Sequence, residues 1–128
     1  MPYRTNWEPG GFIMIFFGQL SAEEIDEANE AFFRDPRSDL ARFQLVDCSG
    51  VTKLTASQQD MSRTAAYDLG ASRSNPRMQL AFISTLPEMT LGIEQYIEVS
   101  KRLNSTWAFA IFVDEASARE WLQQTPED

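Results

Sequence analysis

The fold of this chain is decided by the run FIMIFF at residues 12–17, which is apolar without a break and is followed by Gly18. Six apolar residues rich in aromatic and β-branched side chains favour a β-strand that is buried on both faces. The turn signal EPGG at residues 8–11 precedes the run, because proline presets φ and glycine tolerates a positive φ. We therefore expect residues 3–7 and 12–17 to form a β-hairpin.

Apolar segments alternate with helix signals along the rest of the chain. Further strands are expected at residues 43–47, 78–83 and 107–113, and helices are expected to follow Ser21, Thr55 or Ser57, Pro87 and Asp114. This alternation predicts an α/β fold with a single mixed, mostly parallel sheet and covering helices. The expected element order is ββαβαβαβα, in which the hairpin supplies the antiparallel edge strand.

The whole chain, residues 1–128, is expected to form a single domain. Its length is close to the commonest domain size, and no repeat or low-complexity segment interrupts it. In the second helix, Met61, Ala65 and Leu69 form the expected inward row, and Gly70 is a natural end. We expect residues 123–128 to form a frayed tail.

Composition excludes several kinds of partner. The net charge is −8, from 11 basic and 19 acidic residues, whereas a nucleic-acid-binding protein needs a basic face. No apolar window reaches the ~18 residues of a transmembrane helix. Cys48 is the sole cysteine, so no intrachain disulfide can form, and the N-terminus has no signal-peptide pattern. We therefore predict a cytoplasmic protein that neither binds nucleic acid nor spans a membrane.

Histidine is absent from the sequence. Ser-His-Asp and Cys-His catalysis are thereby excluded, and the commonest zinc ligand is missing. We predict that the chain is not an enzyme and that it uses no metal and no cofactor. The remaining enzymatic hypothesis is acid–base catalysis by its abundant carboxylates.

The segment LVDCSGVTKLTAS at residues 45–57, together with the element order, resembles the STAS fold of anti-sigma-factor antagonists. The resemblance is closer to the bacterial SpoIIAA-like proteins, which are grouped with STAS and SEC14-type (CRAL-TRIO) domains. The closing segment FVDEA at residues 112–116 is also similar to the end of SpoIIAA-like proteins. The resemblance implies a regulatory or protein-interaction module. Kinship with SEC14 implies the alternative, a carrier of a small apolar molecule or a lipid.

Ser57 is the first candidate functional residue. The resemblance places it where the antagonists carry a phosphorylated serine, although Thr55, Ala56 and Gln58 stand in place of an acidic residue, a serine and a glycine. The alternative is structural, with Ser57 or Thr55 acting as the N-cap of the second helix.

A second candidate site comprises Asp47, Ser49, Thr55 and Ser57. Asp47 ends a predicted strand, and ligands in open α/β sheets bind beyond such ends, so these four side chains are candidates for a small polar pocket. Alternatively, Asp47 bonds the amides of the following turn.

Apolar residues supply the remaining hypotheses. A ligand cavity is one interpretation of Phe16, Phe17, Met89, Tyr96 and Trp107, and an ordinary core is the other. The free edge of the first hairpin makes a homodimer possible. The expected partner is therefore a protein, a small apolar ligand or a second copy of the chain.

Overall fold

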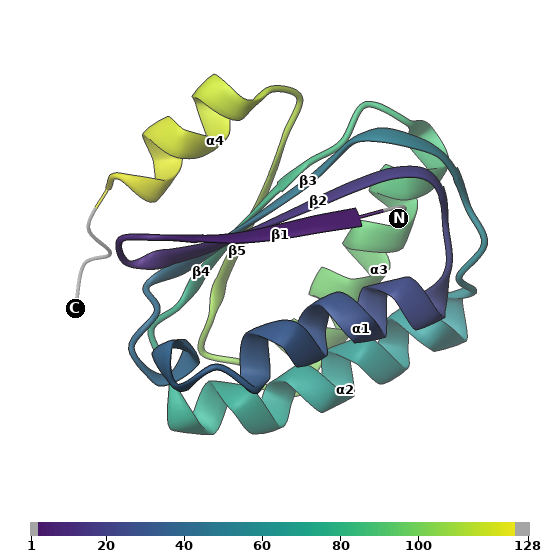
Figure 1. Cartoon of the computed structure of the whole chain (residues 1–128). Coiled ribbons are helices and arrows are strands. Elements are labelled where there is room, and N and C mark those ends of the chain that lie inside the picture. The colour runs from purple at the N-terminus through teal and green to yellow at the C-terminus, as the bar shows by residue number, and fades with distance from the viewer. Residues whose placement is uncertain (1–2, 125–128) are drawn as a thin grey trace.

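The computed structural model of the chain describes residues 3–124, which form a five-stranded sheet and four α-helices (Figure 1). In chain order the elements are β1 (Tyr3–Glu8), β2 (Gly11–Leu20), α1 (Ala22–Phe33), β3 (Phe43–Leu54), α2 (Gln58–Ser74), β4 (Gln79–Ile83), α3 (Pro87–Arg102), β5 (Ala108–Phe112) and α4 (Glu115–Leu122). A short 3₁₀ helix, η1 (Pro36–Asp39), connects α1 to β3. The predicted order ββαβαβαβα is confirmed.

The strands lie in the sheet in the same order as in the sequence, β1-β2-β3-β4-β5. β1 is antiparallel to β2, and every later pair is parallel. The mixed, mostly parallel sheet with one antiparallel edge strand is therefore as predicted.

Helices cover the two faces of this sheet unequally. Figure 1 shows α1, α2 and α3 on one face and α4 alone on the other. Each parallel connection steps the same way across the sheet, and right-handed crossovers then place all their helices on the same face. α4 follows the last strand and turns back over the opposite face.

The unequal cover produces two hydrophobic clusters. The larger lies between the sheet and α1–α3 and includes Phe12, Met14 and Phe16 of β2. The smaller lies under α4 and includes Ile13 of β2 and Ala118 of α4. Successive strand residues point to opposite faces, so the run FIMIFF contributes to both clusters.

Short-range polar signals start most of the helices. Ser21 and Ser57 are the N-caps of α1 and α2, each within a reciprocal capping box, and Asp114 caps α4 through the backbone N–H of Ser117. Pro87 is the first residue of α3. No helix in the described part of the chain has both the length and the hydropathy needed to cross a membrane.

Two strand ends differ from the prediction. β3 does not end at Asp47 but continues to Leu54, because β2 also continues and pairs with it as far as Leu20. The run of β2 does not stop at Gly18, which adopts a φ of 71° beside a register shift in the ladder. Glycine accommodates this φ at little cost, so the strand survives the irregularity.

The predicted end of α2 at Gly70 is wrong. The helix continues to Ser74 and ends where Asn75 precedes Pro76. A residue before proline is disfavoured in the helical region, and proline lacks the N–H that the helix needs. At the other end of the chain, Gln123 is the C-cap of α4, and residues 125–128 of the expected frayed tail lie outside the described residues.

Candidate functional site

Asp47 and Ser49 form a local pair within β3. The Asp47 carboxylate accepts hydrogen bonds from the backbone N–H of Ser49 at 2.9 Å and from its hydroxyl at 2.7 Å. This is a short-range contact of the kind expected if Asp47 serves the backbone that follows it. A ligand-binding role for the two residues stays a prediction.

Thr55 and Ser57 lie beyond the end of β3, and each has a structural task. The backbone N–H and the hydroxyl of Thr55 both donate to the carbonyl oxygen of Leu20, which ties the end of β3 to that of β2. The Ser57 hydroxyl accepts from the backbone N–H of Asp60 at 3.1 Å, and the Asp60 carboxylate accepts from the Ser57 N–H at 2.8 Å. Ser57 is therefore the helix cap, and Thr55 is not.

A groove of about 230 Å³ lies between the first turns of α2 and α3, beside Ser57. We call it the Ser57 groove; its lining comprises Leu54, Ala56, Ser57, Gln58, Met61, Glu88, Leu91 and Gly92. Asp47 and Ser49 are not part of this lining, so the groove does not unite the four residues predicted to share a pocket. Leu91, in this lining, is 67% exposed.

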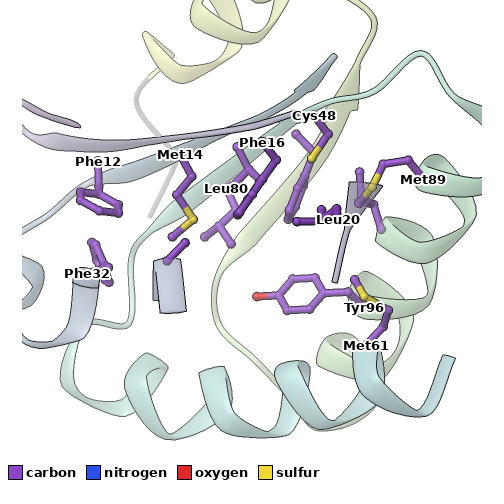
Figure 2. Packing of buried hydrophobic residues seen from close by; sticks show 14 of the residues in the cluster. Phe12, Met14, Phe16, Leu20, Phe32, Cys48, Met61, Leu80, Met89 and Tyr96 are labelled. Atoms are coloured by element: carbon purple, nitrogen blue, oxygen red, sulfur yellow. The ribbon is translucent and has the colours of Figure 1, made fainter. Parts of the chain in front are cut away.

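A second hollow lies inside the molecule, between the sheet and α1–α3. We call it the Asp68 cavity; it has a volume of about 50 Å³. Its walls are largely apolar and include Met14, Phe16, Leu20, Val46, Cys48, Met61, Leu80, Phe82, Met89 and Ile93. Figure 2 shows Met14, Phe16 and Leu80 on the sheet side and Met61, Met89 and Tyr96 on the helix side. Neither Phe17 nor Trp107 belongs to the cavity lining.

Polar side chains from four elements also line the Asp68 cavity. Asn29 comes from α1, Gln44 from β3, Thr64 and Asp68 from α2, and Tyr96 from α3. All five residues are buried. They give an otherwise apolar lining five polar side chains.

Asp68 is the most unusual of these groups. Asp68 is 6% exposed, and the Tyr96 hydroxyl donates a hydrogen bond to Asp68 Oδ2 at 2.6 Å. Oδ1 is buried and has no partner. A buried oxygen without a partner loses its hydration and gains nothing in return.

Burial controls the protonation of this cavity. Burial is the largest cause that raises the pKa of Asp68 to about 7. The hydrogen bond from Tyr96 lowers this pKa, and the charge of Asp26 raises it further. Burial also raises the pKa of the Tyr96 phenol well above its usual value, and the Asp68 charge adds to it. The pKa of the Cys48 thiol is raised to about 12, again mainly by burial. Asp68 is therefore the group in the cavity that changes charge near neutral pH.

Comparison with known proteins places the fold. No protein-family model matches the sequence, and no curated protein matches it. Among solved structures, the chain is similar to an uncharacterised protein of the DUF3478 family with a SpoIIAA-like fold from Shewanella loihica PV-4, at 14% sequence identity and a TM-score of 0.55. The match covers 94% of this chain and 91% of the other. The chain has a SpoIIAA-like fold.

The polar lining of the Asp68 cavity is not among the sites predicted from the sequence. The sequence did carry a signal for the cavity, since α2 has polar residues on its buried side, at Thr64, Asp68 and Ser72 beside Met61 and Ala65. Of the predicted inward row, Met61 and Ala65 are buried, but Leu69 is not among the buried residues of α2. A polar residue at helical spacing from a buried methionine was the missed indication of a polar group in the core.

No group of three or more His, Cys, Asp or Glu side chains within residues 3–124 is arranged to hold a metal ion. The nearest acidic neighbour that affects Asp68 is Asp26, which is exposed on α1. The chemistry that this arrangement supports is therefore hydrogen bonding and charge pairing at one carboxyl group.

Proposed function

We propose that this chain is a non-catalytic protein-interaction module of SpoIIAA-like fold, which binds a partner protein at the Ser57 groove. The observation that carries the proposal is Leu91, a large aliphatic side chain that is 67% exposed on the rim of this groove. With the apolar walls of the groove, Leu91 offers a partner apolar area to bury, as the apolar centre of a protein interface does.

The chemistry of the groove indicates what the partner presents. Ala56, Met61 and Gly92 give the groove apolar walls, and Glu88 and Ser57 give it polar ones. The chain as a whole carries a net charge of −8, so a basic partner is attracted over long range. We therefore propose a partner segment with one apolar side chain that enters the groove and basic residues around it.

Phosphorylation of Ser57 stays a prediction, and it would place the phosphate at the edge of the Ser57 groove. Ser57 is exposed, and its hydroxyl caps α2. A phosphate at a helix N-terminus is stabilised by the helix dipole, but here it lies beside the Asp60 carboxylate. The modification would add negative charge at the edge of the groove and so change its affinity for a basic partner.

Affinity capture with matched variants tests the proposal. Tagged wild-type protein, Leu91→Asp and Val113→Asp are each incubated with native lysate, and captured proteins are quantified by mass spectrometry. Val113 is a suitable control because it is 70% exposed and does not line the groove. We expect a partner that wild type and Val113→Asp retain and that Leu91→Asp loses by about 10-fold or more, the cost of burying an unpaired charge. Equal capture by Leu91→Asp, or no specific partner, contradicts the proposal.

The second candidate function is the binding of a small molecule, which the Asp68 cavity favours. Sites for drug-sized ligands have volumes of about 300 Å³ or more, whereas this cavity has about 50 Å³. The volume favours a molecule of a few non-hydrogen atoms over a lipid chain.

A further inference from the structure

The unpartnered oxygen of Asp68 is the starting point. Native proteins leave few buried polar atoms without a hydrogen bond, and each such atom asks for an explanation. Asp68 Oδ1 is the one such side-chain atom within residues 3–124, and it belongs to a residue that lines a cavity. The cavity thus holds an acceptor that no described residue satisfies.

The surrounding groups make this acceptor a site rather than an isolated defect. Asn29 and Gln44 line the same cavity from α1 and β3. The Tyr96 hydroxyl already donates its hydrogen bond to Asp68 Oδ2. Asp68 Oδ1 therefore remains available to a molecule in the cavity, and two amide side chains belong to the same lining.

Charge determines which kind of molecule is favoured. The cavity lining contains no Lys or Arg, and Asp68 is its only carboxylate. The thiol of Cys48 and the phenol of Tyr96 stay protonated, because burial raises both pKa values. An anion would meet no positive charge there, whereas a cation would pair with ionised Asp68.

The surface hollow next to the Asp68 cavity also has acidic side chains in its lining. A surface hollow of about 320 Å³ lies between α1 and α2, which run side by side in Figure 1, and it shares Asn29 and Thr64 with the Asp68 cavity. Its outer lining includes Asp26 and also Glu30, which pairs with Arg34. The one basic residue in that lining, Arg63, pairs with Asp60. A cation arriving by this hollow thus passes acidic side chains before it reaches Asp68.

We propose that the Asp68 cavity binds a small primary alkylammonium ion. Its nitrogen donates a hydrogen bond to Asp68 Oδ1, and its short carbon chain contacts the apolar walls. Met14, Met61 and Met89 lie in those walls, and methionine adapts its shape more readily than other apolar residues. A volume of about 50 Å³ admits a few non-hydrogen atoms, and movement of the methionines admits a somewhat longer chain.

Methionine-methyl NMR tests the proposal, because the methionines report on the cavity directly. The protein is labelled with ¹³C at the methionine methyl groups and titrated with propylammonium, 1-propanol and propionate. Met14, Met61 and Met89 line the cavity, and Met78 is an internal control because it is equally buried but does not line it. We expect propylammonium to shift the three cavity methyl signals saturably and to leave Met78 unchanged. The expected dissociation constant is on the order of 1 mM, as suits so few atoms.

Discrimination between the three probes identifies the contact with Asp68. We expect 1-propanol to bind about 10-fold more weakly than propylammonium, and propionate to cause no saturable shift, since only the ammonium makes a charge-assisted bond. Equal affinity for the alcohol and the ammonium ion, or shifts that do not saturate, overturns the proposal. This comparison uses wild-type protein alone, so it does not depend on how a variant folds.

Two variants complete the test. Asp68→Asn, which keeps an acceptor for Tyr96, should lower the affinity for propylammonium by about 10-fold or more. Asp39→Asn removes an exposed carboxylate outside the cavity and should leave the affinity unchanged. Unchanged binding in folded Asp68→Asn overturns the proposal. The Ser57 groove and the Asp68 cavity share Met61, but Leu91 lines only the groove and Asp68 only the cavity. Variants at these two residues therefore test the two proposals separately, and the failure of either leaves the other standing.

Discussion

Helix α2 carries two aspartates in opposite circumstances. Asp60 lies in the first turn of α2, where its carboxylate accepts a hydrogen bond from the backbone N–H of Ser57. Hydrogen bonding with Ser57 lowers the pKa of Asp60. Asp68 lies further along the same helix, inside the hydrophobic cluster, where burial raises its pKa. The same side chain is thus a local structural device at one position and an unsatisfied acceptor at the other.

The difference separates a folding role from a binding role. Every hydrogen bond that the Asp60 carboxylate needs is supplied by residues near it in sequence, so the helix start explains its presence. The Asp68 carboxyl has one partner, Tyr96, from a different helix, and one oxygen with none. Keeping an acid there costs stability, which a bound cation would return.

The strongest test of this contrast is the pH dependence of stability in Asp68→Asn. In the unfolded chain the Asp68 carboxyl ionises near its ordinary pKa of 3.8, and in the folded chain near 7. Between these values the folded state binds more protons, so the wild-type unfolding free energy falls as pH rises and levels off above pH 7. We expect a fall of about 2 to 3 kcal/mol between pH 5 and pH 8 from this group, which Asp68→Asn removes.

Urea unfolding of both proteins at pH 5 and pH 8 measures this difference. Asp26 and Tyr96 also face Asp68, and they are unchanged in the variant, so the comparison isolates the one carboxyl. Stability curves with the same pH slope in wild type and Asp68→Asn would contradict the assignment.

Tyr96→Phe should have the next largest effect. It removes the hydroxyl that donates to Asp68 Oδ2 and leaves the carboxyl without a described partner. We expect a loss of about 1 to 3 kcal/mol in unfolding free energy at pH 8. Tyr67→Phe is the matched control, because Tyr67 is 60% exposed, and it should change stability by less than about 0.5 kcal/mol. A similar loss of unfolding free energy in the two variants would show that the buried hydrogen bond between Tyr96 and Asp68 stabilises the fold no more than an exposed hydroxyl does.

Ser57→Ala examines the other end of α2. Loss of the cap should lower the unfolding free energy by about 1 kcal/mol, whereas Ser57→Asp keeps an oxygen that can accept from the Asp60 N–H. Thermal unfolding followed by circular dichroism ranks wild type, Ser57→Asp and Ser57→Ala. An alanine variant as stable as wild type would mean that the hydroxyl is not the cap that the geometry indicates.

Leu91→Ser should have the smallest effect on stability, below about 0.5 kcal/mol, because most of the side chain is already exposed. Differential scanning calorimetry measures it. A loss above about 1 kcal/mol would show that Leu91 serves the core and would remove it from the proposed interaction surface.

Most of the fold was predictable because its signals are local. The run at residues 12–17, the capping boxes and the proline at the start of α3 each act within a few residues. The extension of β3 to Leu54 was not predictable in this way, since it depends on pairing with the end of β2. The continuation of α2 past Gly70 shows that a glycine ends a helix only where the following residues allow it.

The candidate sites divide along the same line. The cap at Ser57 follows from a spacing of residues within the sequence, whereas the Asp68 cavity requires α1, β3, α2 and α3 to meet. Nothing near Asp68 in the sequence identifies Tyr96 as its partner or Gln44 as its neighbour. The polar residues Thr64, Asp68 and Ser72 on the buried side of α2 are the indication within the sequence, where the helical spacing predicts an apolar row.

Carboxyl ¹³C NMR during a pH titration compares the two aspartates of α2 in a single sample. The account predicts that Asp68 titrates with a midpoint near pH 7 and that Asp60 titrates below its ordinary pKa of 3.8. A midpoint for Asp68 at or below 3.8 would contradict it, because that carboxyl would then be hydrated or fully partnered, and no unsatisfied site would exist in the core.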